Sequence, residues 1–189
     1  AKKPRAFMLE NVRNLVAHDK GKTFKVIMSH LEALGYIVYA KVLNALDYGC
    51  IQKRERIIIV GFLDKVSFSF PKKEINHMTL SDILEQDVTS KYYVKPEIRE
   101  SRLKRLKDKN YPKPYISHEN MAGSITPHPY SSCLRAGASA NYILINDERR
   151  PTEREMLRLQ GFPDTYRIVL PYSKIKKQCG NSVAVPVIK

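Results

Sequence analysis

Residues 5–62 limit most strongly which fold this chain can adopt, because they contain a short apolar run that ends in a single acid. The run, residues 6–9, has the character of a buried parallel strand. Glu10 follows it directly, at the place where open α/β sheets bind their ligands. An acid after an apolar strand is commonly a solvated loop residue, so Glu10 is a candidate site residue that needs further support.

A second charged group precedes the apolar run at residues 57–62. If residues 52–56 are extended, Gln52, Arg54 and Arg56 share one face of the strand. Such alternation is also typical of the exposed start of an ordinary strand. The functional alternative is that the acid and the two arginines together bind a small, polar and partly anionic target.

The pattern around these residues predicts an α/β fold. Apolar side chains recur at helical spacing between residues 24 and 34, and Gly35 ends the helix. Residues 36–43 and 56–62 are predicted strands. A strand, a helix and a strand joined by short links form a βαβ unit, so we expect a parallel sheet.

The charge of the chain indicates its partner. Lys and Arg outnumber Asp and Glu by 33 to 19, a net charge of +14, which predicts attraction to a polyanion. No apolar run approaches the roughly 20 residues of a membrane span and no signal peptide opens the chain, so we expect a cytoplasmic protein that needs no membrane. The three cysteines lie far apart without a Cys-x-x-Cys pair, which indicates neither a disulfide framework nor a metal site.

Much of the positive charge lies in residues 91–113, which carry nine Lys or Arg and three Asp or Glu. The apolar residues of this basic run do not form a clean helical stripe. Lys104 and Arg105 are candidates for phosphate contact, which positions a protein on a nucleic acid without reading its sequence. A solvated basic face is the alternative, and the sequence favours neither.

Several ordered segments carry a family resemblance. They are residues 10–12 (Glu-Asn-Val), 40–49, 52–56 (Gln-Lys-Arg-Glu-Arg), 154–163 (Arg-Glu-Met-Leu-Arg-Leu-Gln-Gly-Phe-Pro) and 178–183 (Gln-Cys-Gly-Asn-Ser-Val). In order and spacing they resemble the C-terminal portion of the bacterial cytosine-C5 DNA methyltransferases. The resemblance covers nearly the whole chain and thins between residues 65 and 124.

The resemblance implies an α/β fold in two parts. One part is the second half of a Rossmann-like S-adenosylmethionine-dependent methyltransferase sheet, and the other is a small, irregular target-recognition domain. Residues 1–64 then hold the later strands and helices of the catalytic domain, and residues 65–150 form the target-recognition domain. Residues 151–189 contain the recognition-domain helix that returns to the catalytic domain and the segment that closes over the cofactor. Thr152 and Glu155 predict a capping box at the start of that helix.

The chemistry of the family assigns roles to three residues. In the family, a cysteine thiolate adds to carbon 6 of cytosine, and carbon 5 of the resulting enamine takes a methyl group from S-adenosylmethionine. By resemblance, Glu10 is the donor at N3, Arg56 contacts O2, and Arg54 lies near Glu10 and the DNA backbone. The base must leave the duplex to enter this pocket.

Other residues take family roles by position. The cofactor segment is Asn181, Ser182 and Val183. The candidate contacts to double-stranded DNA are Gln52, Arg135, Lys104 and Arg105, and the expected structural residues are Asn11 and Arg154. Cys133 occupies a place where threonine is common, so the phosphate contact expected of that hydroxyl stays open. The resemblance implies no metal.

Two family features are absent from these 189 residues: the Pro-Cys-Gln loop with the nucleophile and the glycine-rich loop that holds the cofactor. Cys50, Cys133 and Cys179 lie in other motifs, and free cysteines are commonly small buried hydrophobes. We therefore expect the C-terminal part of a bacterial, nucleoid-associated restriction–modification enzyme, inactive alone. Its N-terminal part would be on the same polypeptide or in a separate subunit. The alternatives are a non-catalytic DNA-binding specificity subunit on the same scaffold and an RNA-directed relative.

Overall fold

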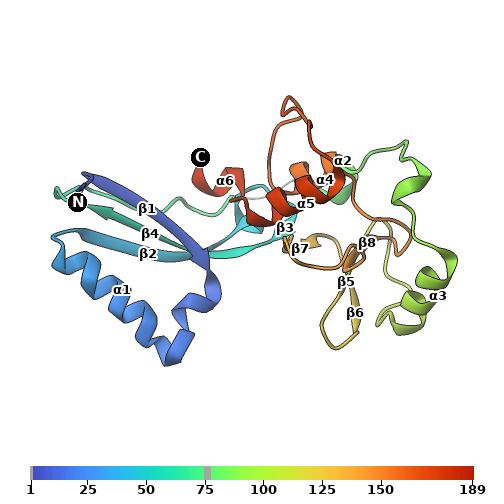
Figure 1. Ribbon diagram of the computed structural model, residues 1–189, viewed down its shortest axis with the longest axis horizontal. Coiled ribbons are helices and arrows are strands. Elements are labelled where there is room, and N and C mark those ends of the chain that lie inside the picture. The colour runs from blue at the N-terminus through green and yellow to red at the C-terminus, as the bar shows by residue number, and fades with distance from the viewer. Residues whose placement is uncertain (1, 75–77) are drawn as a thin grey trace. The chain divides into compact units, whose positions relative to one another are not determined.

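Figure 1 shows the computed structural model, which describes residues 2–74 and 78–189. These residues form two compact units. The first unit consists of the chain up to Asn44 together with Glu55–Lys73, and the second consists of Ala45–Arg54 together with the chain from Glu74 onward. The functional boundaries at residues 64 and 150 stay a prediction.

A three-stranded sheet forms the centre of the first unit. Its strands, in order across the sheet, are β1 (Ala6–Val12), β4 (Glu55–Phe62) and β2 (Ile37–Asn44). β4 lies between the other two and runs antiparallel to both. The three predicted strands are confirmed, but the expected parallel sheet is wrong, because β4 lies between β1 and β2 and is antiparallel to each of them. A strand is recognised from its own residues, whereas its direction depends on which distant strand pairs with it.

β1 is more exposed than its apolar sequence predicts. Met8 and Leu9 are 52% and 44% exposed, and Val12 is 51% exposed. Among the residues that the structure describes, β1 pairs along one edge only, with β4. Glu10 lies inside the strand, opposite Ile58, and not at its end. β1 therefore offers an apolar strand with an unpaired edge, which is a ready template for a further strand.

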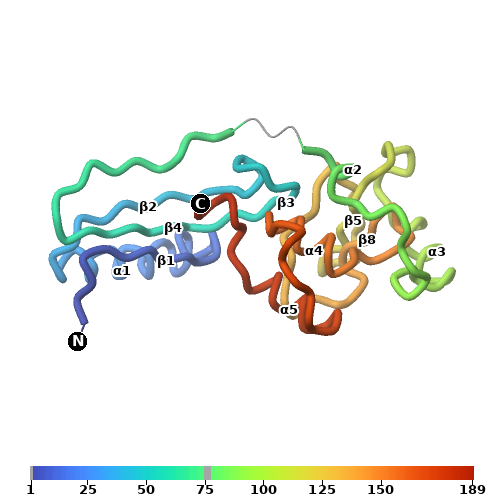
Figure 2. The backbone as a smooth tube through the Cα atoms, turned by 90° about the horizontal axis from the view of Figure 1, so that it is seen from above, coloured from blue at the N-terminus to red at the C-terminus, as the bar shows by residue number. Residues whose placement is uncertain are grey.

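One helix lies against this sheet. α1 (Lys22–Ala33) covers one face of it, as the two views in Figures 1 and 2 agree. The helix confirms the prediction for residues 24–34, and Gly35 follows it with a left-handed φ of 88°. Two short 3-10 helices, η1 (Arg13–Val16) and η2 (His18–Gly21), connect β1 to α1.

The second unit contains two small sheets. One has the order β6 (Ile125–His128), β5 (Ile116–Glu119) and β8 (Ile143–Ile145) with antiparallel neighbours, and the other pairs β3 (Gln52–Lys53) with β7 (Ser131–Ser132) in parallel. The prolines at positions 127 and 129 predict a loop at residues 126–130, because each removes a backbone donor, but residues 126–128 are part of β6. Pro127 is tolerated there because β6 is an edge strand.

Helices pack around these strands. They are η3 (Ala45–Tyr48), α2 (Leu80–Ile83), η4 (Ser90–Tyr92), α3 (Pro96–Arg105), α4 (Glu153–Leu159), α5 (Tyr172–Asn181) and α6 (Val185–Ile188). The predicted capping box is confirmed: Glu155 N donates to Thr152 Oγ1 at 3.1 Å, and Thr152 N donates to Glu155 Oε2 at 2.8 Å. Met156, Leu159 and Ile175 of α4 and α5 lie in the main core. No helix in the described ranges is long and apolar enough to cross a membrane.

α3 is a helix that the sequence pattern does not predict. Pro96 lies in its first turn, where proline is favourable. Its buried side is filled by Arg102, which is 1% exposed, in place of an apolar residue. Arg102 Nε lies 2.9 Å from Asp147 Oδ1, and Arg102 Nη2 donates to Ser117 Oγ at 2.7 Å. A charged residue in the core position explains why no apolar stripe marks this helix.

Candidate active site

Glu10 and Arg56 form an ion pair within the first unit. Arg56 Nε lies 2.8 Å from Glu10 Oε1, and the two side chains are 15% (Arg56) and 26% (Glu10) exposed. The strand register explains the pair, because Arg56 lies opposite Val12 and is therefore the diagonal neighbour of Glu10 on the same face of the sheet. The acid and the arginine that the resemblance selects are thus in contact.

The Glu10–Arg56 pair is suited to a planar polar ligand. The ion pair engages Glu10 Oε1, so Oε2 is the oxygen that can face a ligand. A guanidinium keeps its charge and offers several donors in one plane, so Arg56 can serve Glu10 and a ligand together. Both side chains keep some exposure, so a ligand can reach them.

Arg54 has a different environment from Arg56. It is 3% exposed and belongs to the second unit. Its Nη1 donates to Leu134 O at 3.2 Å, and its Nη2 donates to Gly180 O at 3.2 Å and to Ser182 O at 2.5 Å. The expectation that Arg54 and Arg56 project together toward one ligand is therefore revised, since Arg54 binds main-chain carbonyls.

Gln52 is also a buried connecting residue. It is 0% exposed, and its Nε2 donates to Leu159 O at 3.0 Å and to Gln160 Oε1 at 3.1 Å. Its Oε1 accepts a hydrogen bond from Leu134 N at 2.9 Å. Both polar atoms of the Gln52 side chain thus have partners inside the protein, and the DNA contact that the resemblance implies for Gln52 stays a prediction. The expectation of one continuous strand over residues 52–56 is wrong, because β3 and β4 are separated at residue 54.

The predicted cofactor segment lies at the end of α5. Asn181 is the last residue of this helix, and Ser182 Oγ donates to Cys179 O at 2.9 Å. A Cβ on Gly180 would lie 2.2 Å from Ala136 N, so only glycine allows this close approach of two main chains. This close contact between the main chains at Gly180 and Ala136 fixes the position of Asn181 and Ser182.

Asn181 and Ser182 line a hollow of about 450 Å³ in the second unit. Lys174 and Lys177 line it too. Amide and ammonium donors of this kind suit the carboxylate end of an amino-acid-like ligand. The residues present therefore fit part of an S-adenosylmethionine site, and Val183 continues the segment.

The two buried cysteines do not have the character of nucleophiles. Cys50 is 0% exposed and Cys179 is 1% exposed. Burial raises the pKa of each thiol to about 11. Since the thiolate is the reactive form, both side chains are almost entirely protonated and unreactive near neutral pH. Cys133 is partly exposed, and its Sγ accepts a hydrogen bond from Arg54 Nη1 at 3.2 Å.

We expect thiol labelling of the folded chain to be selective. Iodoacetamide near neutral pH should modify Cys133 first and Cys50 and Cys179 on the order of 100-fold more slowly, because a raised pKa lowers the thiolate fraction. Mass spectrometry of digested protein over a time course measures the three rates. In the Cys133→Ser variant the fast phase should disappear, and rapid labelling of Cys50 or Cys179 would contradict the assignment.

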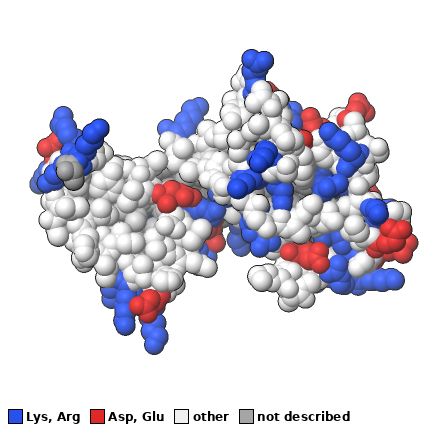
Figure 3. Space-filling model, viewed as in Figure 1, with Lys and Arg blue, Asp and Glu red and all other residues white. Residues whose placement is uncertain are grey.

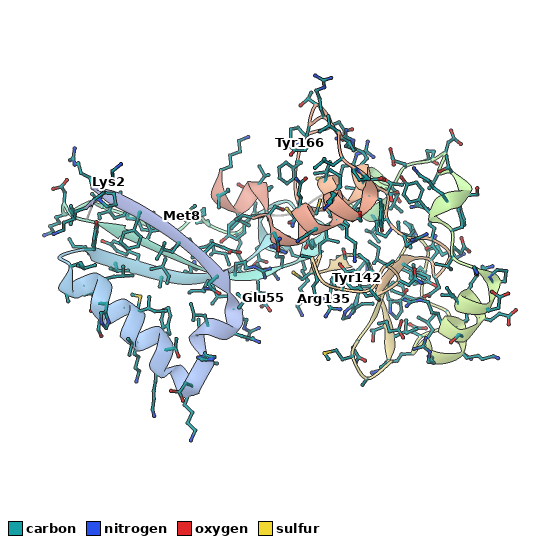
Figure 4. All side chains as sticks on the ribbon, viewed as in Figure 1. Lys2, Met8, Glu55, Arg135, Tyr142 and Tyr166 are labelled. Carbon is teal, nitrogen blue, oxygen red and sulfur yellow. The ribbon has the colours of Figure 1, made fainter. Side chains whose placement is uncertain are left out.

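The candidate DNA contacts differ in how they are held. Arg135 is exposed, and its guanidinium lies 4.9 Å from the centroid of the Tyr142 ring, beside it in Figure 4. Lys104 is exposed on α3, whereas Arg105 pairs with Glu119. Sequence reasoning missed Tyr142, because no motif or spacing marks it.

The two expected structural residues make local contacts. Asn11 Oδ1 accepts a hydrogen bond from Val12 N at 2.8 Å. Arg154 Nη2 donates to Tyr166 O at 2.9 Å and so holds the segment after α4. Tyr166 lies on the loop that projects from the second unit in Figure 4. Both contacts are compatible with structural roles, which stay a prediction.

Comparison with known proteins now places the chain. A model of the C-5 cytosine-specific DNA methylase family matches residues 1–189. The chain belongs to this family. It is 54% identical over 191 residues to the Type II methyltransferase M.HaeII of Haemophilus aegyptius, and 51% identical over 190 residues to M.NgoBI of Neisseria gonorrhoeae. Both alignments cover 100% of this chain and 60% of the relative, so the chain spans about three fifths of the length of these relatives.

Solved structures show the same fold. The Dnmt2 methyltransferase of S. pombe matches 99% of this chain and 66% of its own with a TM-score of 0.73 and 18% identity. A putative DNA modification methyltransferase from an E. coli prophage matches 97% of this chain and 66% of its own with a TM-score of 0.62 and 22% identity. These likenesses confirm the predicted fold class, a mixed α/β portion of a methyltransferase fold.

Proposed function

We propose that this chain is the C-terminal part of a DNA (cytosine-5-)-methyltransferase of a bacterial restriction–modification system. The complete enzyme transfers a methyl group from S-adenosylmethionine to carbon 5 of a cytosine flipped out of a specific duplex site. It acts on nucleoid DNA in the cytoplasm. The observation that carries the proposal is the Glu10–Arg56 ion pair in a member of this family.

Glu10 and Arg56 bind the polar edge of the flipped base. Arg56 donates a hydrogen bond to O2 and holds Glu10 in place. Glu10 provides a proton or a hydrogen bond at N3, where addition of a nucleophile to carbon 6 builds up negative charge. Stabilising that charge makes carbon 5 electron-rich enough to accept a methyl group. A donor placed before the reaction begins needs no reorganisation during it.

Arg54 and the segment after α5 complete this chain's contribution. S-adenosylmethionine, when bound, supplies the methyl group, and Asn181, Ser182 and Val183 are the residues of this chain that we assign to it. Arg54 is a positioning residue, because it holds the carbonyls of Gly180 and Ser182 on either side of Asn181.

The nucleophile comes from outside these 189 residues. The buried thiols of Cys50 and Cys179 have raised pKa values, and Cys133 lies in a different motif from the family's Pro-Cys-Gln loop. We assign the nucleophilic cysteine and most of the cofactor pocket to the N-terminal part, on the same polypeptide or in a separate subunit. The length difference from the curated relatives supports a further portion.

The first unit offers a surface for such a portion. Within the described part of the chain, one edge of β1 is unpaired, and β1 has exposed apolar side chains on both faces, including Met8 and Leu9. Figure 3 shows a broad area without charged side chains over β1. Burying apolar surface of this kind stabilises an association by roughly 25 cal/mol per Å² before the costs of binding.

A reconstitution assay tests the proposal. The chain is mixed with the N-terminal part, radiolabelled S-adenosylmethionine and duplex DNA that contains cytosine. We expect label in DNA only when both parts are present, and none when every cytosine is already methylated at carbon 5. A mixture that binds DNA but transfers no label would favour a non-catalytic specificity subunit and contradict the proposal.

A further inference from the structure

Positive and titratable side chains gather on one surface of the second unit. Its members, called the His–Arg surface below, are Lys53, His118, His128, Arg135 and Lys176. They come from five separate parts of the sequence, which explains why no motif reveals them. The family roles assigned above use only one of them, Arg135.

Tyr142 is the centre of this surface. The Arg135 guanidinium lies 4.9 Å from the centroid of its ring, and Lys176 Nζ lies 5.7 Å from it. The ring of His118 stands edge-on to it at 6.3 Å between centroids. The Tyr142 hydroxyl accepts a hydrogen bond from Arg135 N at 3.0 Å, so the ring is fixed in place. The aromatic face attracts the cations and holds them without neutralising them.

The strand register brings the second histidine to the same side. His128 of β6 lies opposite Ile116 of β5, and His118 follows two residues after Ile116, so both histidines project from one face. His128 stacks on Tyr130 with ring centroids 5.0 Å apart and an interplanar angle of 11°. Lys53 is near enough that its charge lowers the pKa of His128.

The charge of this surface is not neutralised inside the protein. In the described ranges, none of Lys53, Arg135 and Lys176 forms an ion pair with a carboxylate. The basic run at residues 91–113 is different. There Arg99 and Lys113 both pair with Glu148 at 2.9 Å. Cations that are not neutralised inside the protein can replace the counterions bound to a polyanion. The release of those counterions favours binding.

We propose that the His–Arg surface binds the sugar–phosphate backbone of duplex DNA, and that its two histidines take up protons as phosphates approach. The inference rests on the proposed function, because it assumes that DNA is the substrate. Arg135 supplies permanent charge at the surface, and Lys53 and Lys176 add ammonium groups, although burial and the charge of Arg135 lower the pKa of Lys176. His118 and His128 supply charge that depends on pH, so binding of DNA and binding of protons are linked.

The environment of the histidines gives the direction of this linkage. Burial lowers the pKa of His118, and the charges of Arg135, His128 and Arg102 lower it further. The one acid that opposes them, Glu119, is itself paired with Arg102 and Arg105. Burial also lowers the pKa of His128. Both rings are therefore neutral above their ordinary pKa of about 6.5, and gain a positive charge as the pH falls well below it.

Tyr142 does not change the charge of the His–Arg surface in the pH range in which the histidines titrate. Burial raises the pKa of its hydroxyl to about 12, so the ring stays neutral over the whole range in which histidines titrate. A phosphate that approaches the surface favours the protonated histidines. DNA affinity should consequently rise as the pH falls.

Fluorescence anisotropy of a labelled DNA duplex, titrated with the 189-residue chain at about pH 8 and about pH 5.5, tests the inference. The variants are the double substitution His118→Gln with His128→Gln, and Arg135→Gln. His30→Gln is the matched histidine control, because His30 is exposed on α1 in the first unit. Lys25→Gln, on the same helix as His30, is the control for loss of one exposed charge, and circular dichroism verifies that each variant is folded.

We expect the unmodified chain and His30→Gln to bind about tenfold more tightly at the lower pH, and the double variant to lose most of this gain. Arg135→Gln should reduce the slope of log affinity against log salt by about one at either pH, which Lys25→Gln should not do. A double variant that keeps the full pH response would overturn the inference, as would an Arg135→Gln variant with an unchanged slope. If the unmodified chain does not bind DNA at all, the DNA substrate of the proposed function fails as well.

Discussion

Glu10→Gln should slow methyl transfer by the reassembled enzyme by roughly 100-fold or more, with DNA affinity nearly unchanged. The substitution preserves the volume of the side chain and its place opposite Ile58, but an amide cannot supply a proton to N3 of the base. The charge that addition at carbon 6 creates then lacks its partner in the transition state. Single-turnover rates with radiolabelled S-adenosylmethionine measure the effect, and anisotropy measures DNA binding.

Glu55→Gln is the matched control for this experiment. Glu55 lies on β4 beside Arg56 and pairs with Arg13 at 2.9 Å, but the Arg13 side chain is 61% exposed. An exposed pair contributes at most about 1 kcal/mol, so we expect nearly normal turnover. Equal losses in the two variants would show that Glu10 acts through the stability of the sheet. A normal rate for Glu10→Gln would remove Glu10 from the chemistry.

Arg102→Ala should destabilise the second unit by roughly 3–5 kcal/mol, because it leaves a buried carboxylate without its cation. Asp147 is 0% exposed and accepts hydrogen bonds from Arg102 Nε at 2.9 Å, Ser117 Oγ at 2.6 Å and Tyr115 Oη at 3.0 Å. Without Arg102 the remaining neutral donors do not balance the charge. Urea denaturation followed by circular dichroism measures the shift in midpoint.

Lys104→Ala supplies the comparison, because Lys104 lies on the same helix and is exposed. A surface substitution of this kind changes the free energy of unfolding by about 0.5 kcal/mol or less. If both variants unfold at the same urea concentration, the Arg102–Asp147 pair does not stabilise the unit.

Local sequence predicted the local structure well. The strands of the first unit, the helix before Gly35 and the capping box of Thr152 and Glu155 are set by periodicity and by contacts three or four residues apart. The sequence pattern does not predict α3, because its buried side is occupied by Arg102 in place of apolar residues. Whether an arginine is buried depends on a distant acid, here Asp147, that no local pattern shows.

The candidate site was predictable in composition but only partly in arrangement. The Glu10–Arg56 contact follows from a strand register that the sequence does not contain, although the resemblance selects both residues. Alternation predicts that Gln52, Arg54 and Arg56 share one face, whereas the side chains of Gln52 and Arg54 bind inside the second unit. Alternation decides which residues share a face, but tertiary packing decides whether that face meets solvent.

The most direct test of the account is to trap the reaction on DNA in which 5-fluorocytosine replaces cytosine. Once carbon 5 has accepted the methyl group, it carries fluorine in place of the proton whose removal would release the thiolate, so the covalent adduct persists. Denaturing electrophoresis of the reassembled enzyme then shows which part carries the DNA. We expect the adduct on the N-terminal part, and a strongly reduced yield with Glu10→Gln. An adduct on Cys50, Cys133 or Cys179 of this chain would contradict the account.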